Sequence, residues 1–280
     1  MYHVASEYGV LKKVLLARPE YLDVSNPINV IAEKHSKHTL NVEQACKEHA
    51  LFVEALEEHD VEVYLAETHP RFPYEVNTRD LGVSTEKGIV FGRFQNPYRW
   101  GEHRLAERTL HEHKIPIHYQ LTAGNLEGGD VMYIDEKTVG VGTGIRTDET
   151  AVKALETYLH ELGKNIIQIP FSEKYLHLDM IMNVIGEKVA IICEEALPHT
   201  LVKWLEEESF QLIRVSEEDV FLHKCNLLNI GNQVIISHHQ AASVNTELKE
   251  LGYTVVELAL EEILKSGGGP RCMSFPVERE

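Results

Sequence analysis

A unit of about 50 residues recurs along the chain, and this repeat constrains the fold more than any other feature. Each unit opens on a turn that carries Asp or Asn and continues into two apolar strands joined by a short charged or Gly/Asn turn. Asp80, Asp130, Asp179 and Asn226 open four such hairpins at intervals of 50, 49 and 47 residues, and Cys272 follows 46 residues later. A near-constant period of this length is typical of repeat architectures.

A helical pattern and a further strand follow each hairpin, and one such pair precedes the first hairpin. The helices are expected over residues 43–59, 101–113, 149–163, 197–208 and 244–252, and the strands over 61–66, 115–121, 165–170, 210–215 and 254–259. These five pairs have only four complete hairpins. We therefore expect the strands near the two ends, KKVLLARP and CMSFPV, to pair with each other and close a ring.

The pattern predicts a five-bladed, pseudo-symmetric α/β propeller of ββαβ repeats. The alternative is a doubly wound α/β sheet, the common host of alternating strands and helices. The hairpins disfavour it, because neighbouring parallel strands need long crossovers rather than short turns. We expect a single domain over residues 1–280, with repeats at roughly 30–75, 76–125, 126–170, 171–220 and 221–280 and the N-terminal strand closing the ring.

The charge balance restricts the partners. The chain has 27 Lys and Arg against 44 Asp and Glu, a net charge of −17. This argues against nucleic acid and against an anionic membrane surface, both of which need basic protein surfaces. It is compatible with a small cationic substrate, although an acidic surface can also serve solubility alone. The sequence is compatible with a homo-oligomer.

Cysteine usage and the first residues indicate the compartment. None of the four cysteines forms a CxxC pair, and four in 280 residues are too few for a disulfide framework. The first 20 residues lack the basic and apolar regions of a secretory signal, and no apolar stretch is long enough to span a membrane. We expect a cytoplasmic protein.

Polar residues on equivalent turns of a ring converge at one mouth of its axis. The converging set consists of Asp80, Glu127, His177, Asp179 and Cys272. Three carboxylates at equivalent turns suit a planar guanidinium, which presents five N–H donors. His177 and Asp179, two residues apart, point to one face of an extended segment.

Cys272 is the candidate nucleophile because the glycines of SGGGPRCMSFP allow the backbone to approach a ligand closely. Cys46, Cys193 and Cys225 lie within apolar patterns and are interpreted as buried small side chains. We expect no metal and no cofactor, since the chain has neither an HExxH motif nor zinc-type Cys/His spacing.

The ordered motifs TRD, EGGDV, HLD and GGGPRCMS resemble the guanidine-modifying enzyme (pentein) superfamily, which includes arginine deiminases, dimethylarginine dimethylaminohydrolases and amidinotransferases. The resemblance extends from residue 17 to residue 276 and implies a five-bladed propeller. It implies that Cys272 is the nucleophile and that His177 is the general acid and base. Glu127, the third catalytic residue, and Asp179 would hold the guanidinium and orient the system, and Asp80 would make a further contact with the guanidinium. By resemblance of NPYRWGEHR and GTGIRT, Arg99 and Arg146 would bind a substrate carboxylate.

The resemblance implies a hydrolase that acts on the guanidinium carbon of arginine or an arginine derivative through a covalent amidino-thioether on Cys272. The product would be a ureido compound such as citrulline. The alternatives are an amidinotransferase with the same site and a non-catalytic propeller that binds a cationic ligand. Because three carboxylates oppose ionisation of the thiol, we also expect free Cys272 to be mostly a thiol at neutral pH and to lose its proton when a cation binds.

Overall fold

The computed structural model describes residues 3–280. It contains fifteen strands in this part of the chain. They are β1 (Leu11–Ala17), β2 (Glu62–Ala66), β3 (Gly82–Thr85), β4 (Gly88–Phe91), β5 (Ile117–Gln120), β6 (Val131–Tyr133), β7 (Thr138–Thr143), β8 (Asn165–Pro170), β9 (Met182–Gly186), β10 (Val189–Ile192), β11 (Gln211–Arg214), β12 (Leu228–Gly231), β13 (Val234–His238), β14 (Thr254–Leu258) and β15 (Phe275–Arg279).

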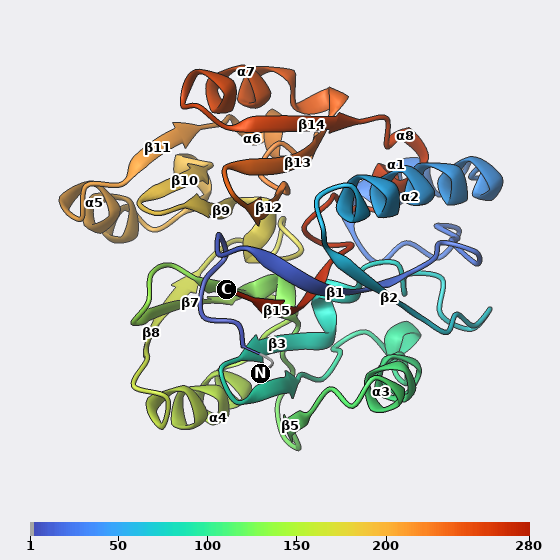
Figure 1. Ribbon diagram of the computed structural model, residues 1–280, viewed down its shortest axis with the longest axis horizontal. Coiled ribbons are helices and arrows are strands. Elements are labelled where there is room, and N and C mark those ends of the chain that lie inside the picture. Colours follow the sequence, from blue (N-terminus) through green and yellow to red (C-terminus); the bar gives the residue numbers. More distant parts are fainter. Residues whose placement is uncertain (1–2) are drawn as a thin grey trace.

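The strands form five three-stranded sheets with the orders β15-β1-β2, β3-β4-β5, β6-β7-β8, β9-β10-β11 and β12-β13-β14. In every sheet the central strand pairs antiparallel with one neighbour, which is its hairpin partner in four of the sheets and β15 in the fifth, and parallel with the strand that follows the helix. The sheets surround a common centre (Figure 1). This confirms the predicted five-bladed α/β propeller.

The two ends of the chain complete the fifth blade. Strand β15 pairs antiparallel with β1, so that Val14 lies opposite Pro276 and Leu15 opposite Phe275. The predicted closure of the ring is therefore correct. The single-domain boundary over residues 1–280 stays a prediction, and its first two positions lie outside the described residues.

Helices lie at the periphery of the propeller (Figure 1). They are α1 (Val30–His35), α2 (Val42–Glu57), α3 (His103–Glu112), α4 (Glu149–His160), α5 (His199–Glu207), α6 (Glu217–Val220), α7 (Ala242–Glu250) and α8 (Glu261–Leu264). The five longest are those that the apolar periodicity predicts. Side-chain caps define the start of two of them: Asn41 accepts a hydrogen bond from the backbone of Gln44, and Asp148 accepts one from Ala151. The short helices α1, α6 and α8 were not predicted, because four to six residues give no helical period.

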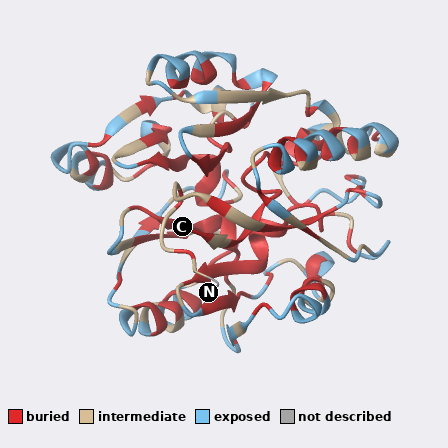
Figure 2. Ribbon diagram, viewed as in Figure 1, coloured by how far each residue is buried: buried red, intermediate tan, exposed pale blue. Residues whose placement is uncertain are grey.

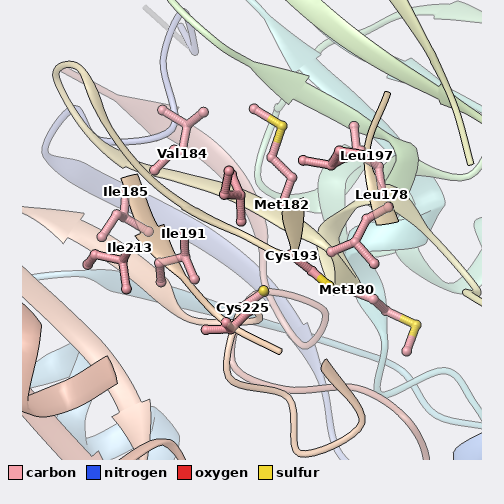
Figure 3. Packing of buried hydrophobic residues seen from close by; sticks show 14 of the residues in the cluster. Leu178, Met180, Met182, Val184, Ile185, Ile191, Cys193, Leu197, Ile213 and Cys225 are labelled. Carbon is pink, nitrogen blue, oxygen red and sulfur yellow. The ribbon is translucent and has the colours of Figure 1, made fainter. Parts of the chain in front are cut away.

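Burial follows the same radial plan. The inner strands are buried and the outward faces of the peripheral helices are exposed (Figure 2). The largest apolar cluster surrounds β9 and β10 and includes Cys193 and Cys225 (Figure 3), both fully buried, as expected for small apolar side chains. Among residues 3–280 no helix has the length and apolarity that crossing a membrane requires.

Three short 3-10 turns lie on the central axis, each directly before the first strand of a hairpin. They are η1 (Thr78–Leu81), η3 (Gly128–Asp130) and η4 (Leu178–Met180), which precede β3, β6 and β9. Turn η1 packs against η3, and η3 packs against η4. The repeat thus brings residues about 50 positions apart into contact, and these turns carry most of the candidate site.

Candidate active site

A histidine between two carboxylates forms one half of the site. His177 is the residue before η4, Glu127 is the residue before η3, and Asp80 lies in η1. The Nε2 atom of His177 is 2.8 Å from Oε2 of Glu127, and its Nδ1 atom is 3.6 Å from Oδ1 of Asp80. All three side chains are at most 3% exposed. The geometry is that of an imidazolium held by a carboxylate on each side.

The charges of this triad stabilise each other. Burial alone would lower the pKa of His177, but Asp80 and Glu127 outweigh burial and raise it to about 9. Burial alone would raise the pKa of Glu127, but the hydrogen bond with His177 and its positive charge lower it to about 2. At neutral pH the histidine is therefore charged and can donate a proton.

The same three residues also meet the spacing of a metal site, since one ligand atom from each lies within 4.8 Å of the others. A metal ion would require a neutral imidazole with a free nitrogen lone pair. The raised pKa of His177 and its contact with Glu127 favour ion pairs with the two carboxylates instead.

The thiol of Cys272 forms the other half of the site. The side-chain Nδ2 of Asn226 lies 3.0 Å from its Sγ atom, and the Oδ1 atom of the same amide accepts hydrogen bonds from the backbone N–H groups of Cys272 and Gly269. Oδ2 of Asp179 is 3.5 Å from Sγ. One asparagine thus fixes both the backbone and the thiol.

The two halves meet at Asp80. Burial, Asp179 and Asp80 raise the pKa of Cys272 well above its usual value, against the smaller opposing effects of Arg271 and Asn226. Asp80 also raises the pKa of His177. The structure therefore combines a neutral thiol with a charged histidine, which agrees with the expectation that free Cys272 is mostly protonated.

Two buried carboxylate oxygens in this region have no hydrogen-bond partner among the described residues: Oδ1 of Asp80 and Oδ1 of Asp179. The amide oxygen of Asn77 is in the same state, and Asn77 is close enough to Gly268 that a Cβ atom there would lie 2.1 Å from Oδ1. Buried acceptors without donors are costly and are usually paired. Together they form a set of acceptors for a ligand that is rich in N–H donors.

The two predicted carboxylate-binding arginines have partners within the protein. Arg99 is 1% exposed and pairs with Asp80 and, at 2.8 Å, with Glu102. Arg146 is 3.4 Å from Glu127 and donates to the backbone oxygen of Ile28 at 2.6 Å. Contact of Arg99 with a substrate carboxylate would require its pairs to open. In this structure Arg99 orients Asp80, and Arg146 orients Glu127, so both support the charged groups from behind.

The glycines of EGGD and GGG allow the turns to approach each other. A Cβ atom on Gly128 would lie 2.0 Å from the backbone oxygen of Gly82, and one on Gly129 would lie 2.8 Å from the ring of His177. Of the three consecutive glycines, only Gly267 has a positive φ, of 97°. These glycines therefore allow close packing between protein segments.

Sequence reasoning missed four residues of this region: Asn77, Asp130, Asn226 and Arg271. The repeat predicts that Asp130 and Asn226 open hairpins, but it does not predict what their side chains bind. Asp130 accepts hydrogen bonds from the backbone of Leu178 at 2.9 Å and from Oγ1 of Thr147 at 2.6 Å. It therefore joins η3 to η4. Asn77 directly precedes the TRD motif, and Arg271 lies within the GGGPRCMS motif, but the sequence assigned neither a role.

Comparisons of the sequence with known proteins find a matching family model and several relatives. The family model described as "N,N dimethylarginine dimethylhydrolase, eukaryotic" matches residues 18–279. Uncharacterized protein YkgA of Bacillus subtilis (strain 168) is 35% identical over 274 residues, which cover 98% of this chain and 94% of YkgA. Arginine deiminase of Listeria monocytogenes serotype 4b is 26% identical over 248 residues. That match covers 72% of this chain and 60% of the deiminase.

Solved structures show the same fold. The N-terminal domain of ArgZ, described as an arginine dihydrolase from cyanobacteria and bound to its product, has a TM-score of 0.85 at 22% identity. The match covers 95% of this chain and 97% of that one. The DDAH of Pseudomonas aeruginosa, complexed with citrulline, has a TM-score of 0.80 at 21% identity, with 95% and 99% of the two chains covered.

Proposed function

Because the chain belongs to the N,N dimethylarginine dimethylhydrolase family of the guanidine-modifying (pentein) superfamily, we propose that it hydrolyses a C–N bond at the guanidinium carbon of arginine or an arginine derivative. Cys272 is the nucleophile and His177 the general acid and base. Glu127 holds His177 in orientation. Asp80 and Asp179 bind the guanidinium.

The observation that carries this proposal is the pair of buried carboxylate oxygens on Asp80 and Asp179 that accept no hydrogen bond from the described residues. Asp80 faces His177, and Asp179 faces the thiol of Cys272. A guanidinium placed between them would donate N–H bonds to both carboxylates. Its central carbon would then lie between the nucleophile and the proton donor.

The reaction follows from these positions. The thiol proton leaves first, and Oδ2 of Asp179, 3.5 Å from Sγ, is the acceptor within reach. The bound cation stabilises the thiolate, which attacks the guanidinium carbon. As the S–C bond forms and the C–N bond breaks, His177 transfers its proton to the departing nitrogen, which leaves as ammonia or an amine.

A covalent amidino-thioether on Cys272 remains. The neutral imidazole of His177 takes a proton from a water molecule, whose oxygen attacks the same carbon and releases the thiolate and a ureido product. Asp179 then returns the proton to the thiolate, which restores the starting enzyme. Glu127 keeps the imidazole in place through both steps, because its Oε2 atom contacts Nε2 at 2.8 Å. Attack by an amine in place of water would make the enzyme an amidinotransferase.

A mass-spectrometric screen tests the proposal. The protein is incubated separately with arginine, methylarginines, agmatine and citrulline, with and without an added amine, and then quenched in acid. We expect a ureido product from at least one guanidine and an adduct on Cys272. Cys272→Ser should abolish both. Cys46→Ser, in which a half-buried cysteine of α2 is replaced, serves as the matched control.

Four outcomes would contradict parts of the proposal. Turnover by Cys272→Ser would remove the covalent mechanism. Binding of guanidines without any product would leave a non-catalytic propeller. Formation of a new guanidine from the added amine, with little ureido product, would identify a transferase. Efficient hydrolysis of neutral citrulline would contradict the need for a cation at the two aspartates.

A further inference from the structure

A second buried ionic cluster lies behind the proposed nucleophile. It consists of Glu7, from the segment before β1, and three arginines: Arg79 of η1, Arg271, and Arg279 of β15. All four residues are at most 7% exposed. Oε1 of Glu7 is 3.2 Å from Nη2 of Arg271, and its Oε2 atom is 3.9 Å from Nη1 of Arg79. Glu7 thus pairs with two of these guanidinium groups and lies within the field of the third, that of Arg279.

This cluster is connected directly to the thiol. Arg271 uses one nitrogen, Nη2, for Glu7 and the other, Nη1, for Oδ2 of Asp179 at 2.8 Å. That same oxygen of Asp179 is 3.5 Å from Sγ of Cys272. Glu7 is therefore separated from the aspartate at the nucleophile by a single guanidinium, although it is 265 positions from Cys272 in the sequence.

The negative charge of Glu7 affects the electrostatic environment of the thiol. Glu7 faces Arg79, Arg271, Arg279 and the backbone N–H of Tyr133. Burial raises its pKa, but the three arginines and that N–H group outweigh burial and lower it, so Glu7 is ionised at neutral pH. Without this carboxylate, three guanidinium groups would lie behind the site with Asp179 as their nearest counter-ion. A nearby excess of positive charge favours a thiolate.

We propose that Glu7 is a positioning residue for the nucleophile: it holds Arg271 so that Asp179 stays against Cys272, and it cancels positive charge behind the thiol. The N-terminal segment is then part of the active site as well as of the closing blade. This inference rests on the proposed function, because it assigns Glu7 a role in the chemistry of Cys272. The groups that face the thiol itself are Asp179, Asp80, Arg271 and Asn226.

The substitution Glu7→Gln tests the electrostatic part. Glutamine keeps the shape and an acceptor for the backbone N–H of Tyr133, which lies 3.2 Å from Oε1, and removes the charge. The rate of alkylation of Cys272 by iodoacetamide, a neutral reagent, is measured from pH 6 to 10. Mass spectrometry separates Cys272 from the other three cysteines. We expect the midpoint to move to lower pH by roughly one unit, as for a charge about 10 Å away at an effective dielectric of about 20.

The substitution Glu7→Asp tests the positioning part. Aspartate keeps the negative charge but shortens the reach to Arg271. We expect the alkylation midpoint to stay near that of the wild type, while kcat/KM for the best guanidine falls about tenfold, mostly through KM, because Asp179 loses its fixed partner. Glu278→Gln is the matched control. It removes a carboxylate of β15 that pairs with Lys13 at 3.1 Å, outside the cluster, and should change neither quantity.

The results separate the two proposals. An alkylation midpoint of folded Glu7→Gln equal to that of the wild type, or one that moves to higher pH, overturns the role of Glu7. If Glu7→Gln fails to fold by circular dichroism, Glu7→Asp decides, and unchanged kcat and KM in that variant also overturn the role. Turnover by Cys272→Ser would instead refute the proposed function, whatever the behaviour of the Glu7 variants.

Discussion

The pair of His177 and Glu127 makes a quantitative prediction about stability and pH. Glu127→Gln removes one of the two carboxylates that hold the buried imidazolium, and keeps the size of the side chain. The folded-state pKa of about 9 for His177, against 6.5 for a free histidine, corresponds to a net stabilisation of the imidazolium by about 3 kcal/mol after the opposing effect of burial. Asp80 contributes through its charge, and Glu127 contributes through both a hydrogen bond and its charge. We therefore expect the substitution to lower the free energy of unfolding by about 1–2 kcal/mol at pH 5.5.

The sign of the pH dependence follows from the raised pKa of His177. Stabilisation by a group whose pKa rises on folding is complete below its unfolded value, here 6.5, and is lost as the pH rises through about 9. The lowered pKa of Glu127 sets the limit at low pH. The stabilisation by this carboxylate is complete above pH 4.5 and is lost as the pH falls toward 2. The difference between wild type and Glu127→Gln should therefore be largest between pH 4.5 and 6.5 and should decrease toward pH 9.

Urea unfolding at pH 5.5, 7.0 and 9.5 measures the free-energy difference. Nuclear magnetic resonance of labelled histidines, with His177→Gln to assign the signal, measures the titration midpoint of His177. We expect that midpoint to fall below about 9 in the variant. Glu43→Gln is the control, because it removes an exposed carboxylate paired with Lys47 on α2. A stability loss that is the same at all three pH values, together with an unchanged midpoint, would refute the ion-pair interpretation.

Three further substitutions have definite expected results. Cys272→Ser should abolish turnover and leave the circular dichroism spectrum and Tm near those of Cys46→Ser, as enzyme assays and thermal unfolding would show. Gly128→Ala should destabilise the protein and abolish activity, because its Cβ would lie 2.0 Å from one backbone oxygen and 2.1 Å from another; near-normal urea unfolding and activity would show that η3 can shift. Ile191→Ala, in the fully buried strand segment of the largest apolar cluster, should cost about 2–5 kcal/mol in urea unfolding, and a cost below about 1 kcal/mol would mean that the cluster repacks.

The fold could be predicted because the repeat is visible in short segments of the sequence. Hairpin turns, apolar strands and amphipathic helices recur with a nearly constant period, and each signal depends only on residues that are neighbours in sequence. Even the closing blade followed by elimination, since KKVLLARP and CMSFPV were the only strands left without a hairpin. The short helices α1 and α8 could not be predicted this way, because they owe their conformation to caps and contacts. Asn29 caps α1, and the carboxylate of Glu48 accepts N–H bonds at the start of α8.

The sequence predicts the positions of the site residues but not the partners of their side chains. Asp80, Glu127, His177 and Asp179 lie at equivalent turns, so the period alone brings them to the axis. The period does not determine which partner each side chain selects there. Arg99 and Arg146 illustrate this, since the resemblance predicts them as ligands for a substrate carboxylate, whereas the structure pairs them with Asp80 and Glu127.

The contacts of Glu7 lie outside any repeat pattern. Its carboxylate reaches Arg271 only because the two chain ends meet in one blade, where Val10 and Glu280 exchange backbone hydrogen bonds. A pairing across 264 positions has no local signal, and a single glutamate in VASEYG looks like a solvated residue. Its burial makes it important, because removing one partner of a buried ion pair leaves the other charge uncompensated. The charges of the buried cluster around Glu7 are therefore constrained as well as those that face Cys272. A substitution there that changes net charge should affect Cys272 more than an equal change at the exposed rim of the propeller.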